Sequence, residues 1–203
     1  PIICNCVSGA GVMNQSLSAL CELETASVSV ATSPQLDGND VLMYALHTGS
    51  GATLGTILAT NSTPDFTYDP VILDCGVTYY ISSVVGDNDG TGSVDLSDVC
   101  LSVSEGTPVV FNCLPTVSIS GGGPICLGQS INASFTLPGN LPYILVVNDG
   151  TQDITLPSLT NGEVWSLSPT QTTTYTLISV ENAITGCTNT ATGSITVTVN
   201  NPV

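Results

Sequence analysis

Short runs of Val, Ile, Thr and Tyr, separated by turn residues about every 8 to 12 positions, constrain the fold of this chain more than any other feature. β-Branched and aromatic residues favour extended strands, whereas Gly, Asn and Asp tolerate the positive φ angles of tight turns. The pattern therefore predicts an all-β protein rich in hairpins. The predicted strands cover residues 26–31, 40–47, 56–60, 65–68, 77–85, 102–112, 116–120, 130–137, 143–148, 153–156, 163–167, 173–180 and 193–199.

The length of 203 residues suits two domains of roughly 100 residues each. One strand run ends at Cys113 and another opens at Thr116, which places the boundary near Leu114-Pro115. The two halves also share an order of features, which suggests a distant duplication: an early cysteine, a late strand centred on tyrosine, and a cysteine before the last strand. We therefore predict two tandem immunoglobulin-like β-sandwich domains, stabilised by disulfides, at residues 1–115 and 116–203.

Eight cysteines in a chain with few charged residues indicate a disulfide framework, and with it an oxidising, extracellular compartment. Their spacing does not suit structural zinc, which uses close pairs of ligands. The order shared by the two halves suggests equivalent bridges. A simple immunoglobulin topology argues against such bridges, because it places the starts of the second and last strands at opposite ends of the domain. Position along the chain favours a further bridge across a hairpin. The expected pairs are Cys21–Cys100, Cys126–Cys187 and Cys75–Cys113, with Cys4 and Cys6 unassigned.

The chain contains no lysine or arginine against 16 acidic residues. Without permanently cationic side chains it cannot neutralise phosphates, so nucleic-acid binding is not expected. No carboxylate can form a salt bridge with Lys or Arg, and clustered acids must be solvated, screened by salt or bound to a metal cation. No apolar run approaches the roughly 20 residues that a membrane helix needs, so membrane insertion is not expected either.

Acidic residues are densest in the first half, in the sequence Asp87-Asn88-Asp89-Gly90 followed by Asp95 and Asp98. Hard oxygen ligands at alternating positions of a turn are what calcium prefers, so these four aspartates form a candidate Ca²⁺ site. The segment departs from the EF-hand loop, because no glutamate closes it and no helices flank it. The alternative is a solvated acidic turn between two strands.

Catalysis would have to be built around His47, the only histidine. No Gly-x-Ser-x-Gly elbow or comparable nucleophile setting accompanies it. Paired carboxylates for glycoside hydrolysis need a deeper cleft than a sandwich of roughly 100 residues offers. We therefore expect no enzymatic activity and predict that His47 is a neutral surface or edge residue at the end of the strand over residues 40–47.

Aromatic side chains suggest two further roles. Trp165, Tyr143 and Tyr68 are the few flat surfaces on which a sugar ring could stack, although Trp165 lies in an alternating strand that favours core packing. Tyr79 and Tyr175 have the position of corner tyrosines, whose hydroxyl groups bond a nearby backbone group.

Three segments of the second half carry a family resemblance: residues 124–130 (PICLGQS), 169–177 (PTQTTTYTL), and 186–188 (GCT) leading into 193–199 (GSITVTV). Together they resemble the PKD-like and immunoglobulin-like repeats of very large secreted surface proteins of Bacteroidota, including gliding adhesins. The first half looks like a companion domain with some fibronectin type III character. It does so through residues 36–42 (LDGNDVL), 76–81 (GVTYYI) and 100–104 (CLSVS).

The resemblance implies secretion and display on the bacterial cell surface, and it implies no catalytic residues. We therefore expect a non-catalytic structural or adhesive module pair of an extracellular fibre, filament or giant adhesin. Its partners would be neighbouring repeats or identical subunits placed end to end, and surface glycans are a further candidate. The alternatives are a glycan- or calcium-dependent binding module, and an accessory domain of a secreted enzyme.

Overall fold

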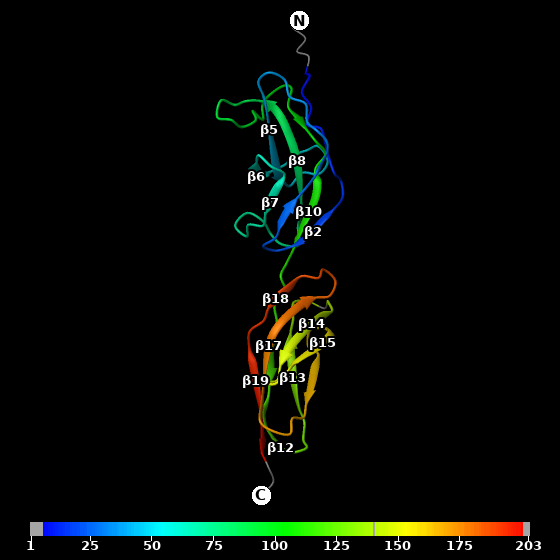
Figure 1. Ribbon diagram of the computed structural model, residues 1–203, viewed down its shortest axis with the longest axis vertical. Coiled ribbons are helices and arrows are strands. Elements are labelled where there is room, and N and C mark those ends of the chain that lie inside the picture. The colour runs from blue at the N-terminus through cyan, green and yellow to red at the C-terminus, as the bar shows by residue number, and fades with distance from the viewer. Residues whose placement is uncertain (1–5, 140, 201–203) are drawn as a thin grey trace. The chain divides into compact units, whose positions relative to one another are not determined.

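The computed structural model describes residues 6–139 and 141–200, in which nineteen strands and no helix are found (Figure 1). The prediction of an all-β protein is confirmed. The chain divides into two compact units, Pro1–Cys113 and Leu114–Val203, which we call unit 1 and unit 2.

Unit 1 is built on one large sheet in the strand order β2-β10-β8-β5-β6, with β9 also paired to β8. Two small sheets, β1-β4 and β3-β7, complete the unit. In the large sheet β2 runs parallel to β10, and the other pairs are antiparallel. The strands are β1 (Val12–Met13), β2 (Ser18–Cys21), β3 (Thr25–Ser27), β4 (Val30–Thr32), β5 (Asp40–His47), β6 (Ile57–Asn61), β7 (Asp65–Thr67), β8 (Thr78–Asp87), β9 (Ser102–Val103) and β10 (Thr107–Asn112).

The large sheet of unit 1 is covered on both faces. Tyr79 and Ile81 of β8 join one core with Phe111 of β10 and the small sheets, whereas Val84 of β8 belongs to a second cluster with Ala45. Because both faces of the sheet are covered, β8 is buried along most of its length. It therefore lacks the alternation of buried and exposed residues expected of a half-exposed strand.

Unit 2 contains two sheets that share one core. The larger has the order β12-β19-β17-β14-β15 with β18 paired to β17, and the smaller is β11-β13-β16. Phe135 of the smaller sheet and Leu145 and Leu177 of the larger one are all buried in this core. The strands are β11 (Ser118–Gly121), β12 (Gly123–Cys126), β13 (Ile131–Thr136), β14 (Tyr143–Asn148), β15 (Asp153–Leu159), β16 (Val164–Leu167), β17 (Thr173–Asn182), β18 (Thr188–Thr190) and β19 (Ser194–Asn200).

Two predicted strands match the structure at both ends, namely those over residues 40–47 (β5) and 143–148 (β14). The predicted strand 26–31 is instead divided, because β3 pairs with β7 and β4 pairs with β1. The predicted strand 102–112 is also divided. Val103 lies opposite Val84 and Thr107 lies opposite Ile81, so this segment uses four residue steps against three on β8. The extra residue interrupts the ladder, as in a β-bulge.

Two disulfides lie within unit 1. Cys6 is bonded to Cys100, 94 residues further along the chain, and Cys75 is bonded to Cys113, 38 residues further along. The second bridge is the pairing that position alone favoured. In the chain-entropy model, loops of these lengths correspond to about 4 to 5 kcal/mol of stabilisation each. Cys21 and Cys187 are also disulfide-bonded, Cys126 is an exposed free thiol, and Cys4 lies outside the described residues.

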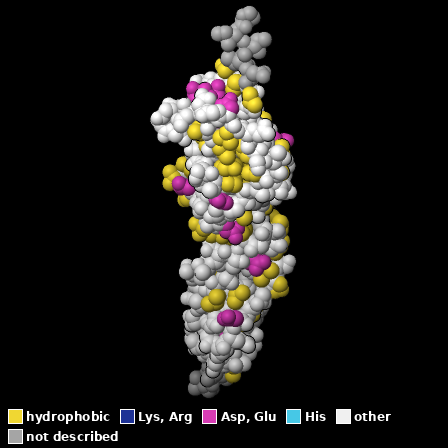
Figure 2. Space-filling view, turned by 45° about the horizontal axis from the view of Figure 1, so that its top comes forward, with side chains coloured by type: hydrophobic (Ala, Val, Ile, Leu, Met, Phe, Trp, Pro, Cys, Tyr) yellow, Lys and Arg dark blue, Asp and Glu magenta, His cyan; other side chains and the backbone are white. Residues whose placement is uncertain are grey.

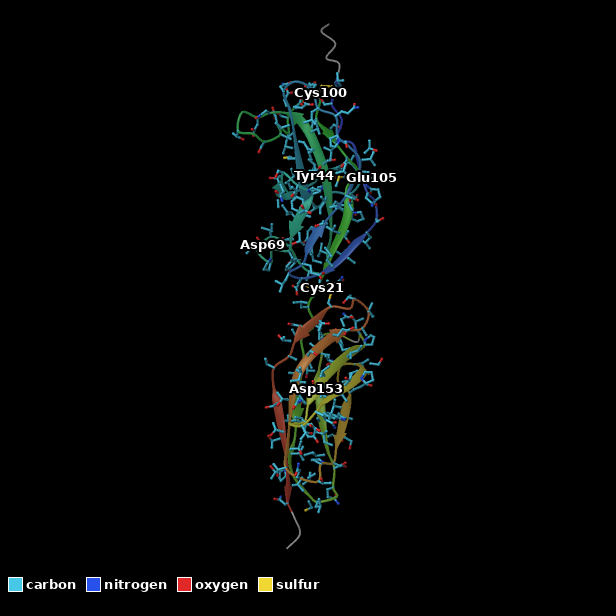
Figure 3. All side chains as sticks on the ribbon, in the orientation of Figure 1. Cys21, Tyr44, Asp69, Cys100, Glu105 and Asp153 are labelled. Carbon is cyan, nitrogen blue, oxygen red and sulfur yellow. A yellow bond between two sulfur atoms is a disulfide. The ribbon has the colours of Figure 1, made fainter. Side chains whose placement is uncertain are left out.

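The predicted bridge Cys21–Cys100 is wrong. Cys21 lies opposite Asn112 at the end of β10, and β10 is antiparallel to β8, so Cys21 lies near the start of β8. Cys100 precedes β9, which pairs with the far end of β8. Figure 3 shows the two labelled cysteines at opposite ends of unit 1. At about 3.3 Å per residue the ten residues of β8 keep them far beyond disulfide distance.

The predicted bridge Cys126–Cys187 is wrong for the same reason. Cys126 lies opposite Asn200 at the end of β19, which is the end of unit 2 where β17 begins. Cys187 immediately precedes β18, which pairs with the last part of β17. The ten residues of β17 separate the two sulfur atoms, and Cys126 is left as a thiol.

Candidate metal centre

Three carboxylates meet at one end of the large sheet of unit 1. Asp40 begins β5 and Asp87 ends β8, and the antiparallel register places these two residues opposite each other. Asp37 lies in the turn before β5. One carboxylate oxygen from each of the three residues lies within 4.8 Å of the others. We call Asp37, Asp40 and Asp87 the acidic cluster; Figure 2 shows magenta acidic side chains gathered near one end of unit 1.

Hydrogen bonds from backbone N–H groups to carboxylate oxygens hold the cluster in place. The Asp37 N–H donates to Asp40 Oδ2 at 3.0 Å. The Asp87 N–H donates to Asp98 Oδ2 at 2.9 Å, and Asp98 Oδ1 accepts from the Cys100 N–H at 2.9 Å. Asp40 Oδ1 is different, because it is buried and no hydrogen-bond donor of the described residues reaches it. A buried carboxylate oxygen without a partner is costly unless a cation or a donor satisfies it.

The surroundings of Asp87 disfavour the charged form of its carboxyl group. Partial burial raises the pKa of the Asp87 carboxyl above its ordinary value, and the neighbouring charge of Asp98 raises it further. Asp40 and Asp37 add smaller increments in the same direction, while a hydrogen bond with Asn39 opposes them. Since the chain has no Lys or Arg, neither can neutralise these groups. A divalent cation coordinated by carboxylate oxygens would do so.

The structure does not bring the four aspartates predicted from the sequence together as ligands. Asp89 Oδ1 accepts from the Thr91 N–H and hydroxyl, both at 2.7 Å, and Asp95 Oδ1 accepts from Ser97 in the same way at 2.8 and 2.6 Å. These hydrogen bonds lower the pKa of both carboxyl groups and close two exposed turns.

The Asp98 carboxylate instead accepts a hydrogen bond from the Asp87 N–H. Of the four predicted aspartates, only Asp87 belongs to the acidic cluster. Asp37 and Asp40 were not predicted. The signal that could have found them is the pairing of the strand over residues 40–47 with the strand that ends at Asp87.

His47 is fully buried, so its prediction as a surface or edge residue is wrong. It ends β5, which lies between β6 and β8 rather than at the edge of the sheet. Its Nε2 lies 2.9 Å from Ser82 Oγ, and the Ser82 hydroxyl donates to the Ser104 carbonyl at 3.0 Å. The Ser82 proton is thus already used, so Nε2 is the donor in the bond to Ser82 Oγ. Burial lowers the pKa of the imidazole, and backbone hydrogen bonds with Leu54 and Gly49 offset only part of this effect.

The lowered pKa of His47 predicts a loss of stability on mild acidification. The unfolded chain protonates His47 near its ordinary pKa of about 6.5, whereas the folded chain resists protonation. The stabilisation is therefore complete above about pH 6.5 and is lost as pH falls toward the lowered folded-state pKa, by up to about 1.4 kcal/mol per pH unit. Urea unfolding between pH 7.5 and 5.5 measures this slope.

His47→Gln is the matched control for the pH experiment, because glutamine retains an N–H group that can donate to Ser82 but does not titrate. The variant is expected to lose most of the slope. An equal slope in the variant would show that carboxyl groups, rather than His47, cause the pH dependence.

The aromatic residues considered as sugar platforms are largely internal. Tyr143 and Tyr68 are buried, and Trp165 packs against Phe135 and against Tyr175, whose ring centre lies 5.2 Å away. The Tyr143 hydroxyl donates to the Pro138 carbonyl at 2.6 Å. These contacts favour a structural role for all three residues.

Of the two expected corner tyrosines, Tyr79 has the predicted interaction. Its hydroxyl accepts from the Asp74 N–H at 2.8 Å. Tyr175 instead packs edge-on against Trp165. In unit 2 the tyrosine hydroxyl that bonds a backbone group five residues upstream is that of Tyr143.

No family model matches the sequence, and no curated protein is similar to it at a significant level. Among the described residues, no helix is long and apolar enough to cross a membrane. The disulfides indicate an oxidising environment, as is typical of extracellular proteins.

Proposed function

We propose that the chain is a non-catalytic structural module pair of an extracellular fibre or bacterial cell-surface adhesin. In this proposal units 1 and 2 are immunoglobulin-like sandwiches, related to fibronectin type III and PKD-like repeats respectively. They join neighbouring repeats or identical subunits end to end and thereby transmit tension. The extensive strand pairing, the disulfides and the internal position of His47 support this role over that of an enzyme.

The observation that carries the proposal is the path of the covalent chain through unit 1. A pull that reaches Cys6 passes through the disulfide directly to Cys100. The intervening segment, which contains β1 to β8, lies in the loop that this bridge closes, so the bridge bypasses it between these two residues. Unfolding of that segment adds nothing to the distance between Cys6 and Cys100. A surface fibre needs this property, since it must keep its length under load.

Unit 2 resists tension through its strand pairing. β12, near the start of the unit, lies parallel to β19, the last strand, with Gly123 opposite Val197. When the two ends of the unit are pulled apart, parallel strands are drawn in opposite directions along their length. Their evenly spaced hydrogen bonds are then loaded together rather than one after another.

Electron microscopy of native material, with antibodies against this chain, tests the proposed function. We expect labelled fibres or stalks on cells, or in the medium around them. Label confined to the cell interior, or to dispersed single particles with no fibre or stalk, would contradict the proposal. A parent polypeptide that contains a catalytic domain would favour the accessory-domain alternative instead.

A second candidate function is calcium binding by the acidic cluster. The specific observation that favours it is the buried Asp40 Oδ1, which has no hydrogen-bond partner in the part of the chain that the structure describes. The cluster offers carboxylate oxygens from three residues, and further coordination would come from backbone carbonyls or water. A cation here would tie the start of β5 to the end of β8. It would thus stiffen the end of unit 1 that also contains Cys100.

Calcium is therefore expected to raise the unfolding midpoint of the wild-type chain relative to a chelator. At a concentration 100-fold above Kd the stabilisation is about 2.7 kcal/mol. Asp40→Asn is expected to abolish most of this response, whereas the matched control Asp89→Asn, outside the cluster, keeps it. Differential scanning calorimetry measures both. Identical midpoints with calcium and with chelator would rule out this second function.

A further inference from the structure

The two units contain the same turn at equivalent positions, each beginning with a cysteine. In unit 1, Cys21 is the last residue of β2 and lies opposite Asn112 of β10, in a parallel pair. In unit 2, Cys126 is the last residue of β12 and lies opposite Asn200 of β19, also in a parallel pair. In both units, therefore, an early strand ends in cysteine beside the end of the last strand.

The hydrogen bonds that follow each cysteine agree one by one. The residue after the cysteine donates its N–H to the opposing asparagine carbonyl, at 2.9 Å to Asn112 and 3.0 Å to Asn200. The cysteine carbonyl accepts from the residue three positions on, Glu24 at 3.2 Å and Gln129 at 2.9 Å. The residue two positions after the cysteine has a positive φ in both turns, 71° at Leu23 and 87° at Gly128.

The chemical state of the two cysteines differs. Cys21 is disulfide-bonded, whereas Cys126 is an exposed thiol. The other five cysteines in the described part of the chain are also oxidised. Because the same position of the same turn holds a disulfide in unit 1, we propose that Cys126 forms a disulfide with a cysteine of another β module that abuts unit 2. This inference rests on the proposed end-to-end role of the chain.

The charge distribution favours contact at this site. The chain has a formal net charge of −16, yet no acidic residue occurs between Glu105 and Asp149. The turn after Cys126 presents the half-exposed Leu127 instead. Two like-charged modules approach each other more readily through uncharged surfaces than through acidic ones.

The reaction that forms the bridge is thiol–disulfide exchange with a disulfide oxidant, either a thiol oxidoreductase or a small-molecule disulfide. The Cys126 thiolate attacks one sulfur of the oxidant and gives a mixed disulfide. The partner cysteine, as thiolate, then attacks the Cys126 sulfur of that mixed disulfide. The new bond joins the two modules, two protons are lost from the two thiols, and the oxidant departs with both electrons as a dithiol or as two thiols.

The test is to extract native material in iodoacetamide and to map its disulfides. Pepsin digestion at low pH is suitable, because trypsin has no Lys or Arg to cleave and acid prevents exchange. We expect the Cys126 peptide to be linked to a cysteine peptide of another module. In parallel, equal amounts of ¹⁵N-labelled and unlabelled purified chain are oxidised together with glutathione disulfide. Mixed-isotope linked peptides would identify the partner as a second copy of this chain, and a foreign peptide in native material would identify a different module.

Cys126→Ser is expected to remove at least nine-tenths of the covalently linked species on non-reducing gels. Cys126 alkylated in native material, or bridged to Cys4 within a single chain, would overturn the inference. The two proposals fail separately. Fibres with alkylated Cys126 would overturn only this bridge, whereas linked Cys126 in material without fibres or stalks would overturn only the proposed function.

Discussion

Stretched from its two ends, the oxidised chain is expected to reach a full length at least about 330 Å shorter than the reduced chain. The Cys6–Cys100 bridge removes 94 residue steps from the covalent path, and each extended residue spans about 3.5 Å. Single-molecule force spectroscopy before and after addition of a reductant measures the difference. Because it is a contour length, it does not depend on the stability of either unit.

The double variant Cys75→Ser with Cys113→Ser is the matched control for this experiment. It removes the shorter loop of 38 residues but keeps the Cys6–Cys100 bridge. The oxidised variant is therefore expected to remain at least about 330 Å shorter than the fully reduced chain. An oxidised wild-type chain that stretches as far as the reduced one would contradict the disulfide assignment, and with it the proposed tension-transmitting role.

Phe111→Ala is expected to destabilise unit 1 by about 3 to 5 kcal/mol. The Phe111 side chain is fully buried in β10, and its ring centre lies 5.5 Å from that of Tyr68. Its removal costs both the transfer of the ring from water and the cavity left behind. Urea unfolding monitored by hydrogen exchange measures the loss at the amide groups of β8.

Val110→Ala is the matched control, because Val110 lies next in β10 on the less buried face. It is expected to cost less than about 1.5 kcal/mol. Neither variant is expected to change hydrogen exchange in β14, which belongs to the separate core of unit 2. Equal loss of protection in β8 and β14 would show that the two cores unfold as a single cooperative unit.

Local pattern was sufficient where turn residues flank an unbroken run of strand-forming residues. β5 and β14 were predicted at both ends because strand propensity and flanking turns are properties of neighbouring residues. The divided segments were not predicted, since the bulge between Val103 and Thr107 follows from their separate pairings with β8. The short strand β2 was missed for a similar reason, because its partner β10 lies about 90 residues away in sequence.

The candidate site could likewise not be predicted from local sequence. Acidic density pointed to the segment after β8, but hydroxyl and backbone donors within that segment occupy Asp89 and Asp95. The residues that meet Asp87 come from the neighbouring strand β5 and from the turn before it. Their position depends on the register of β5 against β8. A register is a relation between distant segments, which no local composition specifies.

Sequence alone determined that this chain is all-β, that no Lys or Arg can pair with its 16 acidic residues, and that an oxidising compartment suits its cysteines. These conclusions hold because propensity and charge belong to each residue wherever it lies. Only the tertiary structure decided which cysteines meet, that His47 is buried, and that Asp37 and Asp40 join Asp87. Those facts depend on the end of the sheet at which each residue lies. The pairing of strands that are far apart in the chain decides this position.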